Sequence, residues 1–271
     1  MKRKYDFVFG TGGSCRCSMG LREAGLQLLS FPYDWNPGPD FVTRCSYLAA
    51  GFPDWLDRKS LRLENPEETE SHLFYKNVKT GFTFIHDFHA KYSFDEQYSE
   101  VCARYERRIA RFLGLLERAH RVLVVWVNVN ADGPFSLDVA AAERGRLALQ
   151  ARWPDKRFDV LVFNFKEGVP YQRAESKENS AVRVVAFDYK DRSPGEDRWM
   201  ADHRILGKWL KGEYEMDDYR TQEEIAAWKK KKANHEYDRY CAKNFLAYVR
   251  NKFEYKLYVH LRKQLKGRGV I

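Results

Sequence analysis

A cysteine follows a glycine-rich turn near the start of the chain. Residues 5–9 are an apolar run that predicts a short buried strand, and the glycines within residues 10–13 interrupt it. Ser14 can cap a helix, and residues 19–26 carry apolar side chains at helical spacing. This order places Cys15 at a helix N-terminus, where free backbone N–H groups and the helix dipole favour a thiolate that attacks carbonyl carbon near neutral pH.

Three other interpretations of this turn are open at the level of sequence. Cys15 can be a structural thiol, since free cysteine is among the most buried residue types. The turn can bind phosphate, but residues 10–15 lack the last glycine of G-x-G-x-x-G and have no Gly-Lys-Ser/Thr. A zinc site could join Cys15 and Cys17 to His86 and His89, but C-x-C is poor spacing for zinc. The spacing alone weights the nucleophile and the buried thiol equally.

A thiolate nucleophile needs a base that shares its proton and a third group that orients this base. His86 is the first candidate for the base, because it directly follows the apolar run 82–85 and precedes Asp87. His203 is the second candidate, since it lies soon after the last predicted strand. The orienting carboxylate would be Asp87 or Asp34, although Asp34 can instead cap a turn.

Other groups near the predicted strand ends can stabilise an oxyanion or contact a substrate. Backbone N–H groups from Gly13 to Arg16 are the expected oxyanion donors, and the side chain of Asn128 or Asn130 is a second source. No metal site is predicted. The predicted oxyanion and substrate-binding residues are Gly13, Ser14, Arg16, Trp35, Asn128, Asp202 and His203.

Strand-like apolar runs alternate with helical patterns along the chain. This alternation predicts an α/β fold with a largely parallel sheet in a layered, Rossmann-like or SGNH-like sandwich. Sites in such sheets form outside the carboxyl ends of the strands. Cys15, His86, Asn128 and Asp188 all follow a predicted strand end, which favours the nucleophile hypothesis. The predicted strands are 5–9, 82–85, 121–129, 158–165 and 182–188, and the predicted helices between them are 95–119 and 136–152.

The chain is expected to contain a catalytic domain and a helical extension. Residues 1–215 form the predicted α/β domain, which includes an irregular aromatic segment, 31–72, expected to be a lid or a substrate wall. Residues 166–180 are polar and predict a surface loop. Residues 216–271 predict an amphipathic basic helix that begins at the capping box of residues 221–224.

The basic charge of the chain is concentrated at its end. Residues 229–271 hold thirteen lysine and arginine residues against three acidic ones, a local net charge of +10, whereas the whole chain carries +9. Such an extension can simply pack with its apolar face, or it can contact an anionic partner such as a membrane surface, an acidic glycan or a nucleotide-activated donor. Nucleic acid is disfavoured because no nucleic-acid-binding motif accompanies the charge.

Cysteine number and hydropathy bear on the cellular compartment. Five cysteines, an odd number, fit reduced thiols better than a disulfide framework. No stretch approaches the roughly 20 apolar residues that a membrane span needs. We therefore expect a cytoplasmic protein without a transmembrane segment, which its basic end can bring to the periphery of the inner membrane.

Several motifs occur together between residues 5 and 210: Gly12-x-x-Cys15, Leu21-Arg22-x-x-Gly25-Leu26, Ser30-Phe31-Pro32-Tyr33-Asp34-Trp35, His86-Asp87-Phe88, Tyr105-x-Arg107-Arg108-Ile109-x-Arg111-Phe112-Leu113, and Trp199-x-x-Asp202 with Trp209. This combination resembles a bacterial family grouped as papain-like cysteine peptidases. The resemblance implies Cys15 as nucleophile and His86 as its partner, with Asp34 and Asp87 as site residues. The chain departs from the pattern at Thr11, where leucine is common, and at Cys17.

Gly-x-x-Cys after a first strand is also similar to GDSL-type hydrolases and to capsule-polysaccharide acetyltransferases that bind coenzyme A.

The first functional hypothesis is an enzyme that transfers an acyl group through a thioester on Cys15. Its acceptor is water, as in a hydrolase or peptidase, or a sugar hydroxyl, as in an O-acyltransferase, and precursors of surface polysaccharides or glycoconjugates are the favoured substrates. No cofactor is required, and coenzyme A or another acyl donor can supply the acyl group. The alternatives are a glycosyltransferase that uses Asp34, Asp87 or Asp202, and a non-catalytic protein that binds glycans or nucleotide sugars on an aromatic platform of residues 31–55.

Overall fold

The computed structural model describes residues 1–13, 15–64, 72–128, 138–165, 168, 172–175, 181–188 and 203–220, together with most positions of 222–230. The chain divides into two compact units, Met1–Asp218 and Tyr219–Ile271. The predicted basic helix falls mainly on residues 231–271, outside the described residues, as does most of the predicted loop 166–180. None of the helices described here is both long and apolar enough to traverse a bilayer.

A parallel sheet forms the centre of the first unit. Its strand order is β2-β6-β7-β9-β8, and only β8 at the edge runs antiparallel to its neighbour. Strand β6 is buried along almost its whole length because helices cover both faces of the sheet, which explains its continuous apolar sequence. The strands are β2 (Phe7–Gly12), β6 (Arg121–Asn128), β7 (Arg157–Phe165), β8 (Gln172–Glu175) and β9 (Val182–Phe187).

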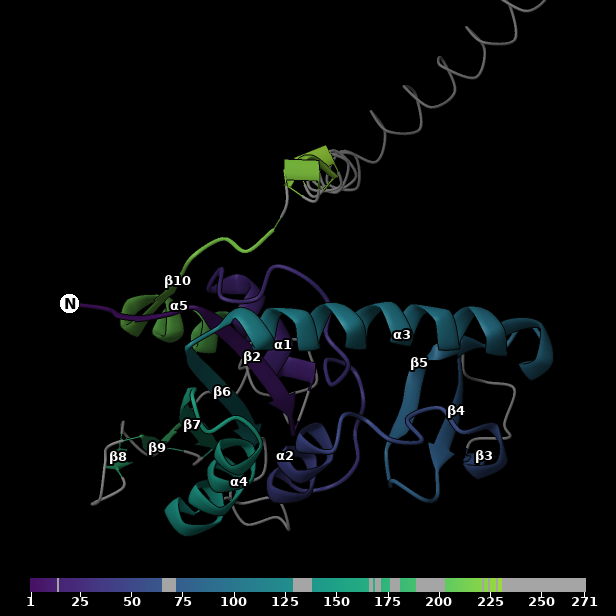
Figure 1. Cartoon of the computed structure of the whole chain (residues 1–271), viewed down its shortest axis with the longest axis horizontal. Coiled ribbons are helices and arrows are strands. Elements are labelled where there is room, and N and C mark those ends of the chain that lie inside the picture. The colour runs from purple at the N-terminus through teal and green to yellow at the C-terminus, as the bar shows by residue number, and fades with distance from the viewer. Residues whose placement is uncertain are drawn as a thin grey trace, which may run out of the picture. The chain divides into compact units, whose positions relative to one another are not determined.

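Helices cover the parallel sheet on its two faces (Figure 1). On one face, α1 (Cys15–Glu23) and α5 (His203–Glu213) bury Leu21 and Leu206 against the sheet. On the other face lie α2 (Phe41–Ala49) and α4 (Val139–Arg152), with the ring of Phe41 against that of Trp126. The predicted α/β fold with a largely parallel sheet in a layered sandwich is therefore confirmed.

A second sheet, antiparallel and three-stranded, corrects one prediction. It consists of β3 (Leu61–Leu63), β4 (His72–Asn77) and β5 (Thr83–His89) in that order. The apolar run 82–85 was expected in the parallel sheet, but it opens β5 instead. This strand continues through His86 to His89 because it pairs with β4, so His86 lies within a strand and not beyond its end. A short parallel pair, β1 (Arg3–Tyr5) with β10 (Tyr214–Met216), completes the sheets.

One long helix, α3 (Phe94–Arg118), contacts both large sheets (Figure 1). The predicted helix 95–119 is confirmed, and Ser93 and Glu96 form a reciprocal capping box at its start. Near its beginning, Phe94 stacks on Phe88 of β5 with ring centroids 5.3 Å apart. Near its end, Phe112 meets Phe9 of β2 edge to face at 4.8 Å. With 25 residues the helix is about 37 Å long, so it fixes the two sheets relative to each other.

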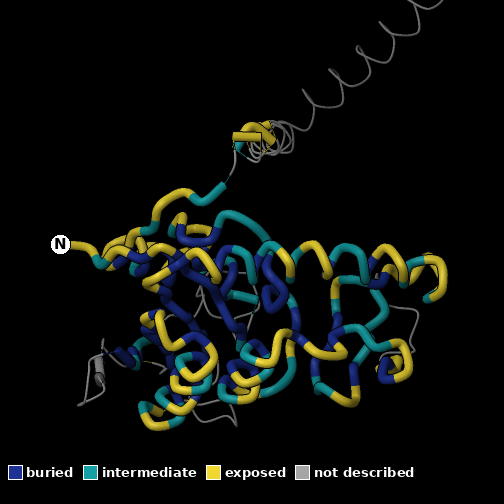
Figure 2. Tube along the Cα trace, viewed as in Figure 1, coloured by how far each residue is buried: buried dark blue, intermediate teal, exposed yellow. Residues whose placement is uncertain are grey.

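The aromatic segment 31–72 is more regular than its sequence suggested. It contains α2, the 3-10 helix η1 (Arg58–Ser60) and β3. Most of its rings belong to the core, where they contact one another and Phe82, so they are unavailable as an exposed glycan platform (Figure 2). Trp35 and Tyr47 are the partly exposed exceptions. The buried rings of this segment are Phe31, Tyr33, Phe41, Phe52 and Trp55.

Two helical glycines give a matched test of the packing between α2 and α4. A Cβ on Gly145 would lie 2.7 Å from Cδ1 of Phe41, which is itself buried against Trp126 and cannot move aside. We expect Gly145→Ala to lower the free energy of unfolding by about 1–3 kcal/mol, despite the helix propensity it adds. A Cβ on Gly114 of α3 meets no atom within 4 Å, so Gly114→Ala should raise the free energy of unfolding by up to about 1 kcal/mol. Urea unfolding measures the stability of both variants. Equal changes in the two variants would contradict the close packing of α2 against α4 at Gly145.

Candidate active site

The turn between β2 and α1 depends on two consecutive glycines. Gly12 and Gly13 have φ angles of +106° and +80°, a region that side-chain-bearing residues rarely adopt. A Cβ on Gly13 would also overlap the carbonyl oxygen of Val127 in β6. The chain can therefore pass directly from the strand into the helix, and Cys15 becomes the first residue of α1. The predicted order of strand, turn and helix is confirmed, with the helix starting at the cysteine itself, but the strand is β2 (Phe7–Gly12) and not residues 5–9, so Gly10 and Gly12 lie within it.

The buried guanidinium of Arg44 stabilises this turn by hydrogen bonds to backbone carbonyls. Arg44 of α2 donates from Nη1 to the carbonyl of Thr11 (2.7 Å), from Nη2 to that of Asn36 (2.9 Å) and from Nε to that of Pro39 (2.8 Å). The absence of a side chain on Gly12 leaves space for Nη1. Burial lowers the pKa of Arg44 to about 10, so it remains charged at neutral pH. Aromatic faces of Tyr33, Phe82 and Trp126 lie around the cation.

The cysteines near the turn differ in accessibility. Cys15 is partly exposed, whereas Cys17 is 1% exposed and directs its Sγ to the carbonyl of Val125. Burial raises the pKa of Cys17 to about 12 and also raises the pKa of Cys45. At neutral pH these two thiols stay protonated and enclosed, which leaves Cys15 as the accessible thiol of the turn. Among the described residues, no group of three or more histidine, cysteine or acidic side chains could hold a metal ion.

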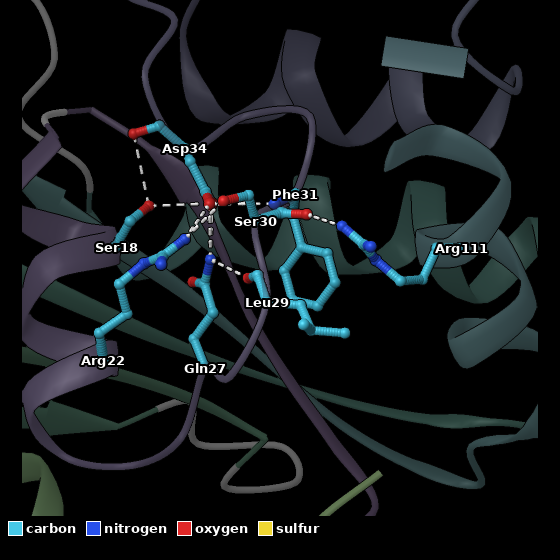
Figure 3. A network of polar contacts seen from close by, with 8 residues as sticks. All are labelled: Ser18, Arg22, Gln27, Leu29, Ser30, Phe31, Asp34 and Arg111. Atoms are coloured by element: carbon cyan, nitrogen blue, oxygen red, sulfur yellow. Dashed lines mark hydrogen bonds and ion pairs between the residues drawn. The ribbon is translucent and has the colours of Figure 1, made fainter. Parts of the chain in front are cut away.

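Asp34 is the centre of a polar network that joins α1 to the aromatic segment (Figure 3). Its side chain is fully buried and forms an ion pair of 2.9 Å with Arg22. Further hydrogen bonds of 2.7–3.0 Å come from the side chains of Ser18 and Gln27 and from the N–H of Phe31. No histidine is among the partners of this carboxylate in the described part of the chain. These contacts give Asp34 a positioning role, and a direct role in catalysis stays a prediction.

His86 lines an open cavity of about 370 Å³. Its exposed ring lies edge-on to Trp35, with centroids 6.1 Å apart, and at the same distance from the ring of His72. It forms no hydrogen bond within the residues that the structure describes. The cavity is lined by Trp35, His86, Asp87, Arg104 and Arg108.

Asp87 does not orient His86 by a hydrogen bond. Its Oδ1 accepts from Nη2 of Arg104 (3.0 Å) and its Oδ2 from the hydroxyl of Tyr105 (2.7 Å), both on α3. Both oxygens are thus engaged in joining β5 to the long helix. His86 and Asp87 thus share no hydrogen bond in the described part of the chain, and the role of Asp87 as the orienting carboxylate stays a prediction.

The second candidate histidine lies beside the first turn of α1. His203 begins α5, and its Nδ1 is 2.9 Å from Nη1 of Arg16, the residue after Cys15. Arginine can only donate, so Nδ1 accepts this hydrogen bond and Nε2 carries the ring proton. Gly20 allows the approach, because a Cβ there would lie 3.2 Å from that of Leu206. His203 is thereby brought to the neighbour of the predicted nucleophile.

The remaining predicted residues are placed less completely. Asn128 is the last residue of β6 and is buried, as expected for a group at the edge of the sheet. Ser14, Asn130 and Asp202 lie outside the described residues. In the described part, Cys15 has no hydrogen bond to a histidine. Catalytic hydrogen bonds often form only when substrate is bound, so this arrangement leaves the roles of the predicted residues as predictions.

Sequence reasoning missed the arginines of the site. Arg44 would have been assigned to the surface by its charge, and only the three-dimensional fold shows the carbonyls around it. Arg104 and Arg108 could have been found, because they stand four residues apart on a predicted helix and therefore share one face.

Fold and site together define an α/β protein that presents one accessible thiol at the N-terminus of a helix, next to the carboxyl edge of a parallel sheet. A family model described as "Putative papain-like cysteine peptidase" matches residues 6–168. The chain belongs to this family, which indicates cysteine-based hydrolase chemistry. No curated protein and no solved structure matches the chain.

Replacement of Arg44 tests whether the turn needs its buried cation. Arg44→Met leaves three buried carbonyls without a donor, and we expect the free energy of unfolding to fall by about 2–4 kcal/mol. Arg44→Lys keeps the charge but reaches fewer carbonyls, so its loss should be smaller. Urea unfolding measures both variants. A change below about 0.5 kcal/mol for Arg44→Met would show that the turn is held by other contacts.

Replacement of Asp34 tests the polar network. Asp34→Asn removes the ionic partner of Arg22 and replaces one acceptor oxygen with an NH2 donor that faces other donors, so stability should fall by about 1–3 kcal/mol. Asp155→Asn is the matched control: the Asp155 side chain is 67% exposed and makes only a 3.6 Å ion pair with its neighbour Lys156, so the substitution should change stability by less than about 0.5 kcal/mol. Thermal unfolding compares them, and equal melting temperatures would contradict the role of Asp34.

Proposed function

We propose that this protein is a cysteine-dependent acyl-transfer enzyme with Cys15 as its nucleophile. The observation that carries the proposal is the position of the thiol: Cys15 is partly exposed at the first residue of α1, whereas Cys17 and Cys45 are buried. Backbone N–H groups in the first turn of a helix have no partner within the helix and stabilise negative charge. Family membership supports the same chemistry.

The reaction follows from the groups around the turn. The thiolate of Cys15 attacks the carbonyl carbon of the substrate, and the N–H groups of the first turn of α1 stabilise the resulting oxyanion. Collapse of this intermediate forms a thioester and releases the leaving group, which takes a proton from the histidine. Water or a hydroxyl group then gives a proton back to the histidine and attacks the thioester, and the thiolate is regenerated.

Each of two histidines has one observation in its favour as the base. His86 lines a cavity that can hold a substrate, and the family resemblance points to it. His203 contacts Arg16, the residue after the nucleophile, although its accepting nitrogen Nδ1 is engaged by the arginine, so His203 could take a proton from Cys15 only after that hydrogen bond breaks. We take His86 as the base and His203 as its rival in the experiment below.

The acceptor and the acyl donor are further parts of the proposal. Hydrolysis needs no more than the site itself, whereas O-acylation of a surface polysaccharide or glycoconjugate precursor needs a donor such as coenzyme A thioester. Residues 229–271, with their net charge of +10, would attract an anionic surface or substrate.

Alkylation rates test the activated thiol. In a pulse of iodoacetamide at about pH 6, an ordinary thiol is almost entirely protonated, whereas an activated one reacts as a thiolate. We expect Cys15 to be modified at least tenfold faster than Cys102, the other partly exposed cysteine among the described residues, and Cys17 to stay unmodified. Mass spectrometry of peptides gives the rates. Equal rates for Cys15 and Cys102 would refute the proposal.

The same measurement identifies the base. His86→Asn and His203→Asn are compared with His89→Asn, which changes an exposed histidine of β5 outside the cavity. The variant that removes the base should slow alkylation of Cys15 at about pH 6 to the rate of Cys102, and His89→Asn should not. Loss of rate in His203→Asn alone would assign the base to His203 and overturn the assignment of His86.

A further inference from the structure

The cavity beside His86 contains an unusual excess of arginine. Arg104 and Arg108 come from successive turns of α3, and Asp87 is the single carboxylate that lines the cavity with them. The ring of Trp35 and the exposed ring of His86 form the rest of the lining. Without the histidine, the lining has a net charge of +1, and a protonated His86 would add one more positive charge.

The carboxylate does not neutralise both arginines. Each oxygen of Asp87 already accepts a hydrogen bond, one from Arg104 and one from Tyr105, and its side chain is only 6% exposed. Arg108 has no ion pair within the described residues and packs its guanidinium over the ring of Tyr105, 5.0 Å from the centroid. The Arg104 side chain is 31% exposed, and Asp87 accepts hydrogen bonds from its Nη2 alone. Two guanidinium groups thus keep donors available at one cavity.

This donor set suits an oxyanion. A guanidinium presents parallel N–H groups that match the oxygens of a carboxylate or phosphate, and such hydrogen bonds are among the strongest in proteins. Two arginines spaced one helical turn apart repel each other until an anion lies between them. The aromatic rings of Trp35 and His86 provide an apolar wall for the group that carries the anion. A cationic ligand would find no unoccupied carboxylate here.

We propose that this cavity binds the carboxylate or phosphate group of the substrate, with Arg108 as the principal contact and Arg104 as the second. The inference rests on the proposed function, because His86 lines the same cavity. At about 370 Å³, the cavity lies at the small end of ligand sites, so it holds the anionic group and one ring-sized portion of a larger substrate. The enzyme would then act on acyl compounds that carry a negative charge.

Binding of three ring compounds to the full-length protein tests the inference. Phenyl phosphate, benzoate and the neutral benzyl alcohol are titrated by isothermal calorimetry at about 0.15 M salt, where distant charges are screened. We expect phenyl phosphate, benzoate or both to bind, and benzyl alcohol to bind at least tenfold more weakly. The anion that binds more tightly indicates whether the substrate carries a phosphate or a carboxylate group. Binding of benzyl alcohol as tight as that of the anions, or no binding at all, would overturn the proposal.

Two neighbouring arginines provide the matched variants. Arg108→Gln should weaken binding of the preferred anion at least tenfold, whereas Arg107→Gln, which removes the same charge from an exposed position outside the cavity, should leave it within twofold. Arg108→Lys should give an intermediate affinity. Equal losses of affinity in Arg107→Gln and Arg108→Gln would show that binding depends only on overall positive charge, which would contradict a site at Arg108. Thermal unfolding confirms that each variant is folded, since Arg108 has no ion pair to lose within the described chain.

The two proposals fail in different ways. The titrations do not need a reactive thiol, so they can be repeated with Cys15→Ser. A reactive Cys15 without anion binding would leave the enzyme proposal intact and remove the substrate class. Anion binding that depends on Arg108, together with an unreactive Cys15, would retain the binding site and remove the catalytic role.

Discussion

The buried cation of Arg44 is the interaction on which the position of the accessible thiol depends. Its three nitrogens donate to carbonyls from the end of β2 and from two points of the loop before α2, so one side chain joins the strand to this loop. A buried charge is expensive unless its hydrogen bonds are satisfied, and here the carbonyls and the surrounding ring faces satisfy them. The guanidinium cannot leave this position without exposing unpaired carbonyls, which makes the turn above it rigid.

A second buried charge complements the first at the helix that follows the turn. Arg44 holds the end of β2, whereas the carboxylate of Asp34 holds α1 through Ser18 and Arg22. Both charges come from the segment of residues 31–49. The aromatic segment is therefore a support for the nucleophile turn, since its rings fill the core and its two ionised side chains connect strand to helix. Opposite charges at two separate points fix the direction of the helix as well as its start.

Much of the parallel sheet could be predicted from sequence, because an apolar run long enough for a strand and covered on both faces leaves a plain pattern, as in residues 121–128. The turn at Cys15 was equally visible. The second sheet was not, since the run 82–85 looks the same whichever sheet it joins, and its pairing with β4 is a non-local choice. His86 was misplaced for that reason. The burial of Arg44 was invisible because a single sequence does not show which carbonyls will surround a cation.

Trp35 connects the thiol helix to the arginine-lined cavity. The guanidinium of Arg22 on α1 lies 5.8 Å from the centroid of its ring, and the ring of His86 on β5 lies 6.1 Å from it. Its neighbour Asp34 is saturated with hydrogen bonds, so the backbone that carries the ring cannot shift independently of α1. Because α3 fixes the two sheets relative to each other, a ligand held by Arg108 would lie at a constant offset from the turn. Substrate selection in the cavity and reaction at the thiol would then be linked through one aromatic side chain instead of a moving loop.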